Sequence, residues 1–127
     1  MEKQIFFHDT DAGGIVYYGN YLKYLEEART EFLEKRGLSV ETFHERNLIY
    51  AVSSCLIHYR SPARYGEVLI CGASLKKATA VKLIFDQLIH EKQSQRLVAD
   101  AEVTLVCLSN DFRPTAIPDD LKEKLTR

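Results

Sequence analysis

A short segment near the N-terminus, Asp9–Leu22, combines residue types that can do chemistry. Two carboxylates, Asp9 and Asp11, flank a threonine, and the glycines at 13 and 14 permit an unusual backbone path. Residues 15–18 are too apolar for a free surface loop, so we expect them to be buried or covered by a ligand. A carboxylate in such a loop can act as a nucleophile or a general base. Asp and Gly are also common turn residues, so composition alone leaves an ordinary turn open.

The common catalytic signatures are missing from the rest of the sequence. It contains no G-x-S-x-G elbow, no phosphate-binding loop, no dinucleotide-binding glycine motif and no H-E-x-x-H. None of the four histidines stands four residues from another, so we expect no metal site and no cofactor. The three cysteines lie far apart in apolar, strand-like surroundings, which predicts small buried thiols rather than a disulfide framework. This cysteine usage predicts a reduced, cytoplasmic protein.

Length and charge restrict the possible function classes. The 127 residues fit one domain, 1–127, and the 46% apolar and 28% charged fractions are those of an ordinary globular protein. Lys and Arg total 17 against 18 for Asp and Glu, so no overall basic charge draws the chain to nucleic acid or anionic lipid. No stretch approaches the length of an apolar membrane span, so we expect no membrane insertion.

The spacing of apolar residues predicts the elements that position this loop. One long helix begins with Asn20 as N-cap and stops at Gly37, so the loop leads directly into its N-terminus. The unpaired amides of that end, which we expect near Asp11, stabilise a developing anion. The order of elements predicts an α+β fold, one antiparallel sheet with the helix packed on one face. The expected strands are 5–7, 48–59, 67–75, 81–90 and 97–108, with short helical segments at 40–47 and from 117 onward.

The segment DTDAGGIVYYGNYL, residues 9–22, resembles the active-site signature of the 4-hydroxybenzoyl-CoA thioesterase family, which has the hotdog fold. The likeness continues in order through 26–33, 62–67, 106–108 and 117–118, so it covers nearly the whole chain. Within the family the chain resembles the bacterial acyl-CoA thioesterases associated with the Tol-Pal system. That branch often has His where this chain has Tyr18. The aromatic pair at 17–18 is closer to the aryl-CoA branch, which leaves the acyl group open.

This resemblance implies a sheet wrapped around the long central helix and a thioester hydrolase. It assigns the reacting carboxylate to Asp11, as nucleophile or as general base, with both routes open. The carbonyl is polarised by the backbone N–H of Tyr18, with Gly19 as a second donor. Asp9 is expected to hold the shape of the loop. Further expected substrate contacts come from the motif and from basic residues that suit the phosphates of CoA: Tyr17, Asn20, Arg64, Lys76, Lys77 and Lys82.

Hotdog enzymes build their site between two subunits, so the resemblance implies a homodimer or homotetramer. The substrate is expected to be a small or medium acyl-CoA or an aryl-CoA, and acyl carrier protein remains an alternative carrier. Two other functions stay open. One is a non-catalytic binding partner for acyl-CoA or acyl carrier protein in an envelope or lipid-synthesis complex. The other is a hydratase or dehydratase, which usually needs a histidine paired with a carboxylate, and His8 is the only histidine near the motif.

Overall fold

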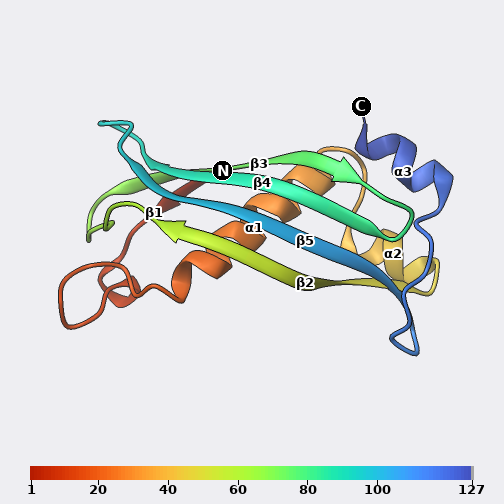
Figure 1. The fold of residues 1–127 in the computed structure, drawn as a ribbon. Helices are drawn as coiled ribbons and strands as arrows, with labels where there is room; N and C mark the ends of the chain where they lie inside the picture. The colour runs from red at the N-terminus through yellow and green to blue at the C-terminus, as the bar shows by residue number, and fades with distance from the viewer. Residues whose placement is uncertain (127) are drawn as a thin grey trace.

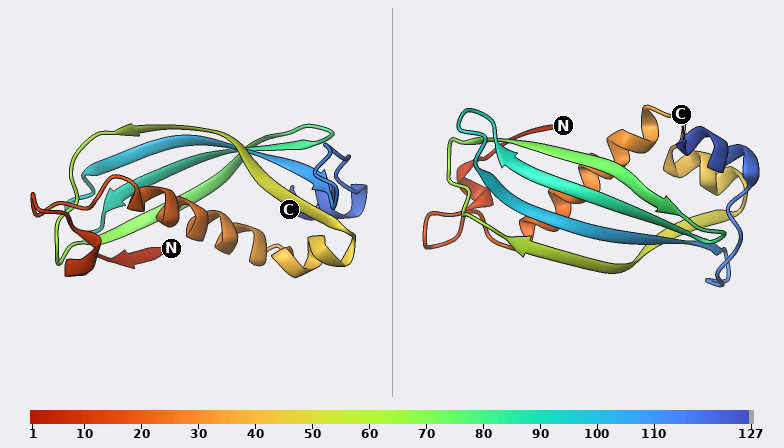
Figure 2. Two further views of the ribbon diagram at one scale, coloured as in Figure 1. Left: turned by 90° about the horizontal axis from the view of Figure 1, so that it is seen from below. Right: turned by 45° about the horizontal axis from the view of Figure 1, so that its top comes forward.

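The long helix α1, Asn20–Glu34, lies across one face of a curled antiparallel sheet (Figures 1 and 2). The computed structural model describes residues 1–126. The sheet has five strands in the order β1-β3-β4-β5-β2, so β1 and β2 form its two edges. This arrangement is the hotdog fold, and it confirms the predicted α+β class and the central helix.

The four long strands, β2 to β5, follow closely the ranges that the sequence predicts for them. The edge strand β2 runs Leu48–Tyr59, as predicted, and each of the other long strands differs from its expected range by at most three residues at either end. The bounds are β1 Glu2–Gln4, the 3-10 helix η1 Phe7–Asp9, α2 Val40–Glu45, β3 Val68–Ala78, β4 Lys82–Glu91, β5 Leu97–Ser109 and α3 Asp119–Leu125.

The core lies between α1 and the face of the sheet that it covers. Along β4, the side chains of Leu83, Phe85, Gln87 and Ile89 are buried, which is the period-2 pattern of a strand with one packed face. The ring of Phe32 on α1 meets the ring of Phe85 edge to face, with centroids 5.4 Å apart. Burial of this apolar surface fixes the helix against the sheet, and with it the position of the helix N-terminus.

A charged side chain is buried in this otherwise apolar layer. Arg29 of α1 is 8% exposed, and its Nη1 donates to Oε1 of Gln87 at 3.1 Å. The Gln87 amide in turn donates to the carbonyl of Leu25 at 3.0 Å. Desolvation lowers the pKa of Arg29. Gln87 therefore links the helix to β4 by two directed hydrogen bonds.

Three sequence-based expectations need correction. The predicted strand at 5–7 is wrong, because pairing with β3 covers residues 2–4 and the chain turns into η1 after Ile5. Asn20 is the first residue of α1 rather than its cap, since Gly19 occupies the N-cap position. Cys55 is exposed, whereas Cys71 and Cys107 are buried as expected, and burial raises the pKa of Cys71 to about 12.

The helix end at Gly37 follows the prediction. Its φ of 75° is the left-handed conformation that glycine adopts without strain, and α1 ends just before it, with Lys35 as C-cap. Among the helices of residues 1–126, none has the length and apolar character to cross a membrane.

Replacing Gln87 with Leu should destabilise the fold. The substitution removes the only hydrogen-bond acceptor that the described residues offer the Arg29 guanidinium, and it buries an apolar group in its place. We expect the free energy of unfolding to fall by roughly 1–3 kcal/mol in urea denaturation. Leu88→Gln, on the exposed face of the same strand, is the control and should change it by less than about 0.5 kcal/mol. Equal stability of Gln87→Leu and the natural chain would contradict this account.

Candidate active site

Asp9 fixes the start of the loop that leads into α1. Asp9 is 6% exposed, and its Oδ2 accepts a hydrogen bond from the amide of Phe6 at 2.8 Å. Its carbonyl accepts two more, from the amide of Tyr17 at 3.0 Å and from Nδ2 of Asn20 at 2.9 Å. Asp9 therefore holds the shape of the loop, as expected, and the side-chain donor of Asn20 is used within the protein.

Asp11 lies at the exposed tip of this loop, in a tight turn. Its Oδ1 accepts from the amide of Gly13 at 2.8 Å, its carbonyl accepts from the amide of Gly14 at 3.0 Å, and its own amide donates to the carbonyl of Ile15 at 2.9 Å. Within residues 1–126, Oδ2 has no hydrogen-bond donor. One carboxylate oxygen is thus held by the turn while the other is free to react.

Two backbone amides just before α1 are unpaired. The amides of Tyr18 and Gly19 have no hydrogen-bond acceptor among residues 1–126, whereas the next one, of Asn20, donates to the carbonyl of Tyr17 at 2.9 Å. A 15-residue helix directs its positive dipole end at this position. The site therefore offers two fixed N–H donors to an incoming oxygen. The carboxylate of Asp11 forms no hydrogen bond with either donor.

Gly19 lets the ring of Tyr17 lie close to the backbone. A Cβ at position 19 would lie 2.7 Å from Cε2 of that ring. The rings of Tyr17 and Tyr18 lie 4.9 Å apart, and the ring of Tyr59 on β2 lies 6.2 Å from that of Tyr18. The rings of Tyr17, Tyr18 and Tyr59 thus form an aromatic cluster next to the helix N-terminus.

The apolar run after the loop is only partly covered. Val16 is 3% exposed, but Tyr17 and Tyr18 are 48% and 63% exposed. Of residues 15–18, which we expect to be buried or covered by a ligand, only Val16 is buried within the single chain. Such large exposed aromatic side chains next to two free amides mark a surface that a ligand or another chain can cover.

A cavity of about 510 Å³ begins at Leu22, in the first turn of α1, and is lined by residues of α1, α2, β2 and β5. Glu26 and Arg29 are charged residues in a wall that is otherwise mainly apolar, and sequence reasoning missed both. The signal for Arg29 was its place on the apolar stripe of the helix, four residues after Leu25. The apolar lining includes Leu22, Leu25, Leu33, Phe43, Val103 and Leu105.

The predicted basic residues lie at two different ends of the molecule. Arg64 pairs with Ile15 through an isolated β-bridge, so it stands beside the Asp11 loop. Lys76, Lys77 and Lys82 lie near the turn between β3 and β4, at the opposite end of the sheet (Figure 1). Lys76 forms an ion pair with Glu102 at 2.7 Å. One protomer brings only Arg64 close to Asp11.

The chain matches known proteins over almost its whole length. A family model described as the thioesterase-like superfamily matches residues 5–125. Acyl-CoA thioesterase YbgC of Helicobacter pylori strain J99 is 30% identical, with 99% of this chain and 98% of that protein covered. Acyl-CoA thioester hydrolase YbgC of Escherichia coli O6:H1 is 29% identical, with 93% and 88% covered.

A solved structure gives the same picture of the fold. It shows 4-hydroxybenzoyl-CoA thioesterase with one aspartate mutated to asparagine and with 4-hydroxybenzoyl-CoA bound. Its sequence is 26% identical to this chain, the TM-score is 0.90, and the match covers 98% of this chain and 96% of that chain.

Gly14→Ala should distort the turn that presents Asp11. Gly14 has a φ of 79°, with open space where a Cβ would stand, so the cost is backbone strain alone. We expect the free energy of unfolding to fall by about 1–2 kcal/mol in urea titrations. Gly72→Ala is the control, because its Cβ would meet only the carbonyl of Leu88 at 4.0 Å. If both variants were equally stable, the strained turn would not be needed.

Proposed function

The chain belongs to the thioesterase-like superfamily and is a thioester hydrolase, and from that premise we propose that it hydrolyses acyl-CoA at the N-terminus of α1, with Asp11 as the reacting carboxylate. The observation that carries this proposal is the pair of unpaired amides at Tyr18 and Gly19. The thioester carbonyl oxygen accepts hydrogen bonds from them, and the helix end stabilises the negative charge that develops on this oxygen.

Asp11 supplies the other half of the reaction in either of two ways. As a nucleophile, its free oxygen attacks the carbonyl carbon, the CoA thiolate leaves, and water then hydrolyses the mixed anhydride. As a general base, the same oxygen takes a proton from the water that attacks the carbonyl carbon. A thiolate is a good leaving group, so one carboxylate and two amides suffice without a Ser-His-Asp triad. Both routes use the oxygen that the turn leaves unpaired.

The cavity beside α1 is the proposed site of the acyl group. It begins at Leu22, in the first turn of the helix that carries the free amides, and its walls are mainly apolar. Its volume of about 510 Å³ lies in the usual range for small-molecule sites, and it can hold a medium acyl chain or an aromatic acyl group. Tyr17, whose ring lies 4.9 Å from that of Tyr18, is proposed to contact the substrate near the thioester.

We further propose that the active unit is a homodimer or a larger homo-oligomer. The edge strand β2 pairs with β5 on one side only, and Val52 and Leu56 on it are exposed. A twofold axis along this edge would pair two β2 strands antiparallel and continue the sheet. The same axis would cover the exposed aromatic residues at the Asp11 end.

The proposed pairing also accounts for the placement of the basic residues. Antiparallel β2 strands put the Asp11 end of one protomer beside the opposite end of its partner. The partner's β3–β4 turn, which carries the three lysines, then lies at the same end as Arg64. Arg64 and these lysines are proposed to bind the phosphates of CoA. The three free cysteines fit a reducing compartment, so we place this reaction in the cytoplasm.

Asp11→Asn should fold normally and lose most of its turnover. We expect the rate of thiol release from a panel of short, long and aromatic acyl-CoA esters to fall by about 10²–10⁴-fold, because Asn cannot attack or accept the proton. Asp86→Asn, an exposed carboxylate on β4, is the matched control.

Two results would contradict the proposed function. One is an Asp11→Asn variant that hydrolyses these esters as fast as the natural chain. The other is saturable binding of acyl-CoA by the natural chain with no thiol released, which would support the non-catalytic alternative. Acyl carrier protein esters, run beside CoA esters, test the carrier.

Dilution should abolish turnover if the site needs two protomers. We expect the specific activity to fall over the concentration range in which sedimentation velocity shows dimers dissociating, and to return on reconcentration. The reason is that a lone protomer leaves the Asp11 end uncovered and holds the three lysines at its far end. Full specific activity in a sample that sediments only as monomer would overturn the oligomer proposal.

A further inference from the structure

The loop between β2 and β3, residues 60–67, holds both halves of the site. The amide of Val16 donates to the carbonyl of Ala63 at 2.9 Å, and Ile15 forms a β-bridge with Arg64. The amide of Ala63 donates to the hydroxyl of Tyr21, in the first turn of α1, at 3.3 Å. The segment that follows the Asp11 turn and the start of the helix are therefore attached to the same short loop.

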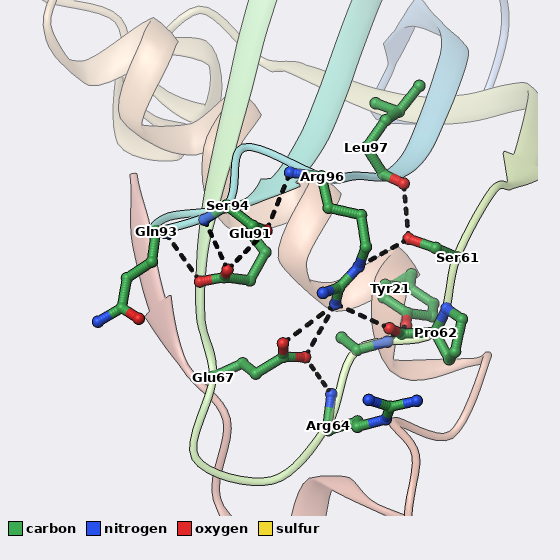
Figure 3. A network of polar contacts seen from close by, with 11 residues as sticks. Tyr21, Ser61, Pro62, Arg64, Glu67, Glu91, Gln93, Ser94, Arg96 and Leu97 are labelled. Atoms are coloured by element: carbon green, nitrogen blue, oxygen red, sulfur yellow. Dashed lines mark hydrogen bonds and ion pairs between the residues drawn. The ribbon is translucent and has the colours of Figure 1, made fainter.

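Arg96 fixes that loop from the turn between β4 and β5 (Figure 3). Its Nη2 donates to the carbonyl of Pro62 at 3.0 Å and to both carboxylate oxygens of Glu67, at 3.0 and 3.1 Å. Its Nε donates to Oγ of Ser61 at 3.1 Å. Oε1 of Glu67 also accepts from the amide of Arg64 at 2.7 Å. One guanidinium thus binds three residues of the loop.

The turn that carries Arg96 is itself held by an internal carboxylate. Glu91 accepts hydrogen bonds from the amides of Gln93 and Ser94, both at 2.9 Å, and from Oγ of Ser94 at 2.8 Å. The two backbone hydrogen bonds are the largest cause that lowers the pKa of Glu91 to about 2. The Glu91 amide also donates to the Arg96 carbonyl at 2.9 Å, so Arg96 extends from a firmly held turn.

We propose that Arg96 and Glu67 are positioning residues for thioester hydrolysis, and that they set the place of Asp11 relative to the free amides of Tyr18 and Gly19. The inference rests on the proposed role of Asp11. The path from Arg96 to Asp11 is short. Arg96 binds the carbonyl of Pro62, and Glu67 binds the amide of Arg64. Ala63, between them, binds the amide of Val16, and the preceding Ile15 accepts the hydrogen bond from the amide of Asp11. Misplacement of a reacting group by about 1 Å can lower a rate by about 10²-fold.

Stability alone does not explain this arrangement. The side chains of Arg96 and Glu67 are 35% and 22% exposed, and ion pairs in contact with water add little to the free energy of folding. A planar guanidinium that donates to several acceptors at once fixes geometry instead. No other arginine of residues 1–126 donates to as many different residues. Two hydrogen bonds, from Arg96 to Pro62 and from Val16 to Ala63, connect Arg96 to the segment that follows the Asp11 turn.

The test uses Arg96→Lys and Glu67→Gln in the full chain, with Arg46→Lys as the matched control. Lysine keeps the positive charge but lacks the planar set of N–H donors. Glutamine keeps an acceptor for the Arg64 amide but lacks the negative charge. Arg46 pairs with Asp120 at the opposite end of the sheet. We expect kcat to fall about 10–100-fold in both test variants, with KM within about threefold, and no change in the control. The double variant should lose less than the product of the two single losses, because the two residues share the contact between the Arg96 guanidinium and the Glu67 carboxylate.

Two further readouts separate positioning from a general loss of structure. Amide hydrogen exchange should show faster exchange at Val16 in both variants, with the amides of β4 and β5 unchanged. In the Asp11→Asn background, Arg96→Lys should cause no further loss of rate. Natural kcat in both single variants, or exchange that rises uniformly across the sheet, would overturn the inference. If Asp11→Asn is inactive while Arg96→Lys keeps full kcat, the proposed function stands and only the positioning role fails.

Discussion

The packing of α1 against the curled sheet is the interaction on which the rest of this structure depends. Burial of residues such as Leu25 and Phe85 fixes the axis of a rigid 15-residue helix, so its N-terminal amides are placed without any side chain of their own. A polarising group made of main chain has no rotamers to lose when a substrate binds. The fold therefore fixes the helix end beside which the amides that we propose to polarise the thioester carbonyl lie.

The carboxylate half is harder to place, because it lies on an exposed loop. Asp9 ties the loop to the first residue of α1, and loop 60–67 ties the segment after the turn to the rest of the sheet. Every contact that restrains Asp11 is thus a hydrogen bond to backbone, either in its own turn or one step away. A loop held in this way keeps its shape while the carboxylate oxygen that we propose to react has no hydrogen-bond donor among residues 1–126.

The sequence predicts the elements with a strong local signal and misses those that depend on distant partners. Strand β2 follows from its β-branched and aromatic residues and from the turn residues after it, whereas β1 does not, because a three-residue polar edge strand has no readable alternation. The motif around Asp11 indicates a loop before a helix. No local pattern indicates that Arg96 reaches Glu67, since the two are 29 residues apart and meet only when β4, β5 and loop 60–67 converge. The same holds for the three lysines, whose end of the sheet the sequence does not specify.

A chain of 127 residues is too small to surround an acyl-CoA, and the protomer leaves several surfaces uncovered. The β2 edge of the sheet is unpaired, residues of β2 line the cavity, and Tyr18 is 63% exposed. Each of these features is costly in isolation, because unpaired edges and exposed aromatic rings favour nonspecific association. All three lie where a second copy related by a twofold axis would cover them, and that copy would bring a basic end toward the one arginine already in place. The exposed features of the single chain are thus the inner surfaces of the unit that we propose to be active.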